Sequence, residues 1–225
     1  RSYSRSGIRN EEKQLLFIRH GLSEMNERLQ VMPWYSENFV DGALWDSRLS
    51  SIGIEQARSL HKKLILTGTE EYQLHRIEVL LSSPLTRALH TSELVFYDEK
   101  NLLPDVNRIV HPLLRERLYL SSEVGRCSSE LRDEFPDWDL TEIPPGKPWW
   151  YIHNYINEKN DSIMTHYHKD KIHLHKGEPN HIFTSRIQQL QQYILSRPEK
   201  YIAIVAHWGV LKALTGIEFQ NCEAR

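Results

Sequence analysis

Two arginines and two histidines lie just after short apolar runs of this sequence. Arg19 and His20 follow the first run, Arg87 follows the second, and His207 comes directly after the third. Guanidinium groups bind phosphate oxygens through paired, charge-assisted hydrogen bonds. Each residue alone is more often structural or on the surface, so their joint placement is what indicates a phosphate pocket.

The apolar runs that precede these residues are short enough to be buried strands, and a helical pattern follows each of them. They are Leu15–Ile18, Ile77–Leu81 and Ile202–Ala206. Strands that alternate with helices predict an α/β fold, with a mostly parallel central sheet and helices on both faces. Ligands of such sheets collect at the carboxyl ends of the strands, where the four residues are expected.

The predicted helices cover residues 50–66, 85–96 and 208–216. Ser83 followed by Pro84 is typical of an N-cap and a first helical residue, so the second helix is expected to begin there. Gly216 is expected to end the third helix. Arg87 then lies in the first turn of the second helix, where a cation opposes the helix dipole unless an anion sits between them.

Composition indicates one ordinary globular domain over residues 1–225, with insertions at about 30–48 and 142–180 above the strand ends. The chain has 28 Lys+Arg and 30 Asp+Glu, a formal net charge of −2, so neither nucleic acid nor a membrane is an expected partner. Two cysteines form no disulfide framework. No run approaches a membrane span in length and no signal core is evident, so the default expectation is the cytoplasm.

An ordered set of motifs resembles the histidine phosphatase superfamily, in its phosphoglycerate-mutase-like branch. The motifs are Leu16–Gly21 (LFIRHG), 46–57 (D-x-x-L-x-x-x-G-x-x-Q-A), 82–91 (SSPLTRALHT), 114–119 (LRERLY) and 206–216, and the C-terminal FQNCEAR resembles a last strand of one mutase-like group. Arg-His-Gly alone is a weak signal, whereas the ordered set covers nearly the whole chain.

The resemblance implies a role for each site residue. His20 would be the nucleophile that forms a phosphohistidine, while Arg19, Arg87 and His207 would hold the phosphoryl oxygens. Glu116 would protonate the leaving oxygen and later activate water; without the resemblance, Glu116 cannot be preferred over Glu123. Ser23 and Asn26 would also contact phosphate, although both are equally consistent with a helix start. No metal or other cofactor is implied, because the arginines neutralise the charge.

The family contains phosphatases and mutases, and two departures favour a phosphatase acting on a small phosphomonoester. Mutases carry an Arg-Arg pair that grips the substrate carboxylate, whereas residues 144–151 read PPGKPWWY. Mutases also favour His-Gly-Asn after the last strand, where this chain has His207-Trp208-Gly209. Glu116 and Tyr119 keep the mutase spacing, so a 2,3-bisphosphoglycerate-dependent phosphoglycerate mutase is the alternative.

Two hypotheses of other classes remain open. The chain could be a non-catalytic module that binds phosphate or a partner, although such members typically lose the nucleophile or an arginine, and both are present here. A histidine-rich tract could instead bind Zn or Cu through neutral imidazoles. Its histidines are His166, His168, His173, His175 and His181, and neighbouring lysines oppose metal binding.

Overall fold

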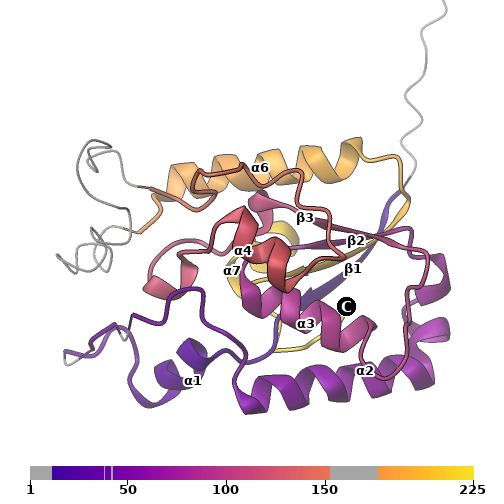
Figure 1. The fold of residues 1–225 in the computed structure, drawn as a ribbon, viewed down its shortest axis with the longest axis horizontal. Helices are drawn as coiled ribbons and strands as arrows, with labels where there is room; N and C mark the ends of the chain where they lie inside the picture. Colours follow the sequence, from indigo (N-terminus) through magenta and orange to yellow (C-terminus); the bar gives the residue numbers. More distant parts are fainter. Residues whose placement is uncertain (1–11, 38, 42, 153–176) are drawn as a thin grey trace, which may run out of the picture.

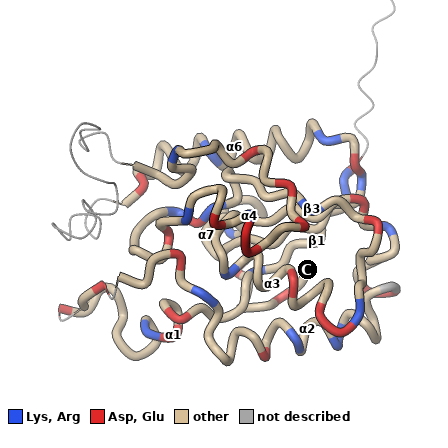
Figure 2. The backbone as a smooth tube through the Cα atoms, in the orientation of Figure 1, with Lys and Arg blue, Asp and Glu red and all other residues tan. Residues whose placement is uncertain are grey.

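The computed structural model describes residues 12–37, 39–41, 43–152 and 177–225 (Figure 1). Much of the second expected insertion lies outside the described residues, as do His166, His168, His173 and His175 of the histidine-rich tract. Along the described chain, acidic and basic residues are interspersed rather than gathered on one side, in keeping with the nearly balanced charge (Figure 2).

The predicted parallel sheet is confirmed. Its four strands are β1 (Gln14–Arg19), β2 (Val79–Ser82), β3 (Asn107–Val110) and β4 (Tyr201–Ala206). They lie side by side in the order β1-β4-β2-β3, and every pair is parallel. Because β4 lies between β1 and β2, the ends of the three predicted strands meet at one edge. The strand β3 was not predicted, since its sequence NRIV has no continuous apolar run.

Helices cover both faces of the sheet, as the sequence predicts. The described α-helices are α1 (Glu24–Val31), α2 (Ser51–Glu71), α3 (Thr86–Phe96), α4 (Ser128–Glu134), α6 (Asn180–Ser196) and α7 (Trp208–Thr215), and short 3₁₀ turns are η1 (Leu74–Arg76), η2 (Pro112–Leu114) and η3 (Ser121–Glu123). Apolar side chains of α2, α3 and α4 pack in one core cluster, and those of α6 and α7 in another.

Successive side chains of a strand point to opposite faces of the sheet, so one strand contributes to both core clusters. Leu80 lies in the cluster with α2 and α3, whereas its neighbours Val79 and Leu81 lie in the cluster with α6 and α7. All three side chains are fully buried. A strand that is buried on both faces needs apolar residues at successive positions, which is why β2 and β4 appear as continuous apolar runs.

The start of α3 corrects the sequence prediction. The helix begins at Thr86, with Leu85 rather than Ser83 at the N-cap. The carboxylate of Asp46 accepts a hydrogen bond from the Thr86 backbone N–H at 2.8 Å, so a distant residue satisfies this helix end. Ser83 instead accepts from the Leu85 N–H at 3.3 Å in the preceding turn.

The other two predicted helices are present. The helix α2 begins after its N-cap Ser50, which accepts from the Gly53 N–H at 3.2 Å, and it ends at Glu71, beyond the predicted end. The helix α7 ends where expected, because Gly216 adopts a left-handed backbone with φ of 75°. No helix within the described ranges combines the length and apolar character needed to cross a bilayer.

The C-terminal residues run beside β1 in the opposite direction. Phe17 and Arg225 exchange backbone hydrogen bonds of 2.8 and 3.0 Å, and Ile18 forms an antiparallel bridge with Ala224. The segment FQNCEAR thus lies along the outer side of β1, where the order of the sheet leaves room for it.

Candidate active site

The structure brings His20 and His207 together. Arg19 and Ala206 are partners in the register of β1 and β4, so the next residue of each strand lies at the same edge of the sheet. The two ring centroids are 4.9 Å apart. Their exposed fractions are 3% for His20 and 0% for His207, so both imidazoles are removed from bulk water.

The hydrogen bond of His20 assigns its tautomer. Nδ1 lies 2.6 Å from the backbone oxygen of Gly21, and because a carbonyl only accepts, Nδ1 carries the proton. Nε2 therefore presents a lone pair, and the Arg87 Nε–H donates to it at 3.4 Å. Burial, followed by the charges of Arg87 and Arg19, lowers the pKa of His20 well below its ordinary value. The ring is consequently neutral and nucleophilic at neutral pH.

Arg87 lies in the first turn of α3, as expected, and is 3% exposed. Its Nη1 donates to the backbone oxygen of Ser122 at 2.7 Å, and its Nη2 lies 3.6 Å from Oε1 of Glu123. These two acceptors compensate the cation at the helix end. Burial raises the pKa of Glu123, with the charge of Arg87 opposing the shift.

Arg19 is anchored at one end of its guanidinium only. Nη1 donates to the backbone oxygen of Phe219 at 2.8 Å, while Nε is buried and has no partner. Burial lowers the pKa of Arg19, Glu116 opposes that shift and Arg87 adds to it. The positive charges of Arg19 and Arg87 thus repel each other, as expected of two cations that face one anion site.

His207 has one satisfied and one unsatisfied nitrogen. Its Nε2 lies 2.7 Å from the hydroxyl of Ser83, and its Nδ1 is buried without a partner. Burial is the largest cause of a pKa well below the ordinary histidine value, followed by the charge of Arg87. The hydroxyl of Ser83 was predicted as a helix cap; its contact with His207 could not be inferred from local sequence.

Glu116 reaches the same edge from the segment after η2. Its Oε1 accepts from the Arg117 backbone N–H at 2.8 Å, and its Oε2 accepts from the Gly209 N–H at 3.1 Å. A Cβ added at Gly209 would come within 2.5 Å of the Glu116 carboxylate. Glycine at this position of α7 therefore lets the carboxylate approach the helix N-terminus that begins beside His207.

Ser23 and Asn26 make the contacts of a helix start. Ser23 is the N-cap of α1, and its hydroxyl accepts from the Asn26 backbone N–H at 3.2 Å. Oδ1 of Asn26 is buried without a partner. Their role in binding phosphate stays a prediction.

Close packing explains the glycine after His20. A Cβ at Gly21 would lie 2.6 Å from the backbone oxygen of Gly53, in the first turn of α2. The Gly21 N–H donates to the hydroxyl of Thr91 at 3.0 Å, and the Asn221 side chain donates to the His20 carbonyl at 2.9 Å. Thr91 lies within a motif quoted above, but nothing in its local pattern indicates this contact.

Within the described ranges, no group of three or more His, Cys, Asp or Glu side chains is arranged to hold a metal ion. The arrangement that is present consists of two arginines, two neutral imidazoles and a carboxylate at one sheet edge. Such a set can bind a phosphoryl group, attack it and exchange a proton with it.

Comparison with known proteins agrees with this geometry. The sequence profile of the histidine phosphatase superfamily (branch 1) matches residues 15–147. A 2,3-bisphosphoglycerate-dependent phosphoglycerate mutase of Histophilus somni is 34% identical over 107 residues, which cover 47% of this chain and 39% of the relative. The mutase of Neisseria meningitidis is 27% identical over 221 residues, covering 89% and 82% of the two chains.

Among solved structures, the ecdysone phosphate phosphatase of Bombix mori, in complex with tungstate, superposes with a TM-score of 0.52 at 13% identity, over 95% of this chain and 88% of that one. This likeness concerns the fold. The match to the Histophilus mutase spans about two fifths of that relative's length. The profile match, which covers more than half of the chain and contains His20, Arg87 and Glu116, establishes that this chain belongs to the histidine phosphatase superfamily.

Proposed function

We propose that the protein is a phosphatase that hydrolyses a small phosphomonoester through a phosphohistidine on His20. One observation carries the proposal. The Nδ1–H of His20 is fixed on the Gly21 carbonyl, which leaves the Nε2 lone pair facing the guanidinium of Arg87. A neutral imidazole held beside a cation is prepared to attack an anion that the cation binds.

In the first step, the Nε2 lone pair forms a bond to phosphorus, and the ester P–O bond breaks. Arg87 transfers its Nε–H hydrogen bond from His20 to a phosphoryl oxygen, and the unpartnered Nε–H of Arg19 donates to another. Fixed cations stabilise the charge of the transition state without reorganisation. Glu116, in its protonated form, gives its proton to the departing oxygen.

His207 binds the phosphoryl group through its buried nitrogen. When the hydroxyl of Ser83 donates to Nε2, the proton of the neutral ring resides on Nδ1, the atom without a partner. That N–H then donates to a phosphoryl oxygen. In the second step, the Glu116 carboxylate takes a proton from water, the water oxygen bonds to phosphorus, and the P–N bond breaks to regenerate His20.

The choice of a phosphatase rests on the segment 144–151. It has no arginine pair, and its Trp149 is buried, with Nε1 donating to the Arg126 carbonyl at 2.8 Å. Trp149 also packs against Gly125 so closely that a Cβ there would lie 1.9 Å from the ring. The segment therefore offers apolar surface and no arginine pair that could hold a substrate carboxylate. The names of the curated relatives favour the mutase alternative.

The deciding experiment measures products and the covalent intermediate. The protein is incubated with a panel of phosphomonoesters, and with 3-phosphoglycerate in the presence and absence of 2,3-bisphosphoglycerate. Release of inorganic phosphate together with an acid-labile phosphoenzyme supports the phosphatase. Rapid isomerisation of 3-phosphoglycerate with little released phosphate supports the mutase, and equal inactivity of the wild type and His20→Ala supports a binding module.

A further inference from the structure

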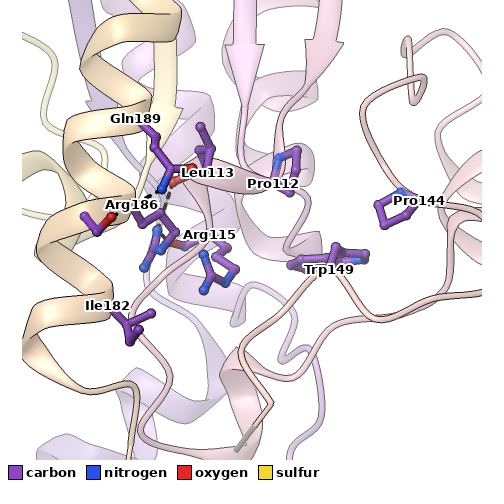
Figure 3. A pocket seen from close by; sticks show the side chains of 9 residues that line it. Pro112, Leu113, Arg115, Pro144, Trp149, Ile182, Arg186 and Gln189 are labelled. Atoms are coloured by element: carbon purple, nitrogen blue, oxygen red, sulfur yellow. Dashed lines mark hydrogen bonds between the residues drawn. The ribbon is translucent and has the colours of Figure 1, made fainter. Parts of the chain in front are cut away.

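A second pocket lies between the N-terminal half of α6 and the segments at η2 and residue 149 (Figure 3). Its volume is about 440 Å³, which is enough for a small organic molecule. The lining residues are Pro112, Leu113, Arg115, Pro144, Trp149, Ile182, Ser185, Arg186 and Gln189. None of these residues belongs to the set around His20 and His207.

A buried ion network forms one wall of this pocket. Glu178 is fully buried and accepts from Arg186 at both carboxylate oxygens, from Nε at 3.0 Å and from Nη2 at 2.9 Å. Arg115 also donates to this carboxylate, from Nη2 to Oε1 at 2.7 Å. Two guanidinium groups thus share a single carboxylate, and one positive charge of the network has no counter-ion among the described residues.

The two arginines differ in how their donors are used. Arg186 is bonded at Nε and Nη2 to Glu178, and its Nη1 donates to the backbone oxygens of Leu113 and Arg115, each at 2.8 Å. Arg115 has a buried Nε without a partner, although its side chain is 9% exposed. Figure 3 shows the Arg115 side chain between α6 and the Trp149 ring.

Burial lowers the pKa of Arg115 to about 10, and the charge of Arg186 adds to the shift. The side chain is still charged at neutral pH. A buried cation with an unused N–H is costly unless an acceptor reaches it, since an unpaired buried donor loses its hydration without a replacement.

We infer that this pocket binds a small organic monoanion, a carboxylate with an apolar body, at a site separate from the catalytic one. The carboxylate would pair with the guanidinium of Arg115, which lines the pocket, and the apolar body would lie against Trp149 and Ile182. A single uncompensated charge is balanced by a carboxylate, whereas a phosphate dianion would leave an excess negative charge in a buried setting. The hydroxyl of Ser185 and the amide of Gln189 supply further hydrogen bonds at the rim.

Calorimetric titration with benzoate, benzamide and phenylphosphonate tests the site. The full chain is first saturated with orthovanadate, which occupies the phosphoryl position beside His20. Benzoate is expected to bind at one site per chain, and the uncharged benzamide about tenfold or more weakly, because it lacks the charge-assisted bond to Arg115. Phenylphosphonate, as a dianion at pH 8, is expected to bind more weakly than benzoate.

Three variants give the structural control. Arg115→Met keeps the side-chain length and leaves Glu178 paired with Arg186, and it is expected to weaken benzoate about tenfold or more. Ile182→Glu places a negative charge at the half-open rim without touching the ion network, and it is expected to weaken benzoate as well. Arg132→Met removes an exposed arginine of α4 that does not line the pocket, and benzoate affinity should stay unchanged.

Absence of benzoate binding to the wild type overturns the inference. So does equal affinity in the wild type, Arg115→Met and Ile182→Glu. Loss of benzoate binding on addition of vanadate would show that the two sites are one, and would equally contradict a separate site. None of these outcomes depends on whether the protein proves to be a phosphatase or a mutase.

Discussion

The two arginine-lined regions of this molecule bury similar groups and use them differently. In the network of Glu178, Arg186 donates to a carboxylate and two carbonyls, so its bonding capacity serves the packing of α6 against η2. At the candidate site, Arg87 holds a carbonyl and faces Glu123, and Arg19 holds a carbonyl. The Nε–H of Arg87 is directed toward His20, and that of Arg19 has no partner among the described residues. A buried arginine indicates a binding site through the donors that the fold leaves unused, more than through its charge.

The largest effect should come from the nucleophile. His20→Ala removes the proposed nucleophile, and we expect turnover to fall by about 10⁴-fold or more. Phosphate release and phosphoenzyme trapping measure the loss. His75→Ala is the matched control, because His75 is exposed on η1, which precedes β2, whereas Ser83 follows the other end of that strand. A comparable loss of turnover in His75→Ala would contradict the role proposed for His20.

Arg186→Met should be the most damaging change in the other region. It leaves Glu178 fully buried with Arg115 as its remaining cation partner among the described residues, and breaking such a pair costs about 3–5 kcal/mol. Urea unfolding measures the change in the free energy of unfolding. Arg115→Met should cost much less, because the pair of Glu178 and Arg186 survives; equal costs would show that the two arginines are equivalent.

Ser83→Ala isolates the positioning of His207. We expect kcat to fall about tenfold with KM nearly unchanged, because the alanine leaves Nε2 of the ring without its hydroxyl partner. Ser83→Thr should restore most of the rate, since it returns the hydroxyl. A loss of stability with unchanged kcat would instead mean that Ser83 serves only the turn before α3.

A smaller effect is expected from the buried histidines as pH falls. The pKa values of His20 and His207 lie well below the ordinary 6.5, and that of His111 is lowered to about 4, in each case chiefly by burial. Below pH 6.5 these three histidines bind more protons in the unfolded chain than in the folded one, so their contribution to the free energy of unfolding decreases as pH falls and is constant well above that value.

Unfolding in urea between pH 8 and 4.5 checks this dependence. His111→Asn should reduce the dependence of the free energy of unfolding on pH. His111 stacks on Tyr193, with ring centroids 3.9 Å apart, and it lies outside the candidate active site. Stability that rises on acidification to pH 5 would contradict the assignment of neutral buried rings.

The sequence predicts those parts of the candidate site that follow directly from apolar strands. The runs before His20 and His207 are continuous and apolar, so their strands and the meeting of the two histidines at one edge could be predicted. The strand β3 could not be predicted from an apolar run, because its sequence NRIV is half polar. The start of α3 could not be predicted either, because the residue that caps it, Asp46, is distant in sequence. Glu178 lies within the histidine-rich tract, and no local pattern indicates its two arginine partners.

The position of β1 in the sheet has a consequence for biosynthesis. Among the described strands β1 pairs only with β4, and residues 219–225 hold it from the other side, with Asn221 bonded to the His20 carbonyl. The strand that precedes the proposed nucleophile is made well before both of its neighbours, β4 and residues 219–225. Such long-range pairing slows folding. A nascent chain therefore carries the proposed nucleophile without its partner His207 until β4 is made, and the proposed activity should appear only after residues 219–225 have emerged.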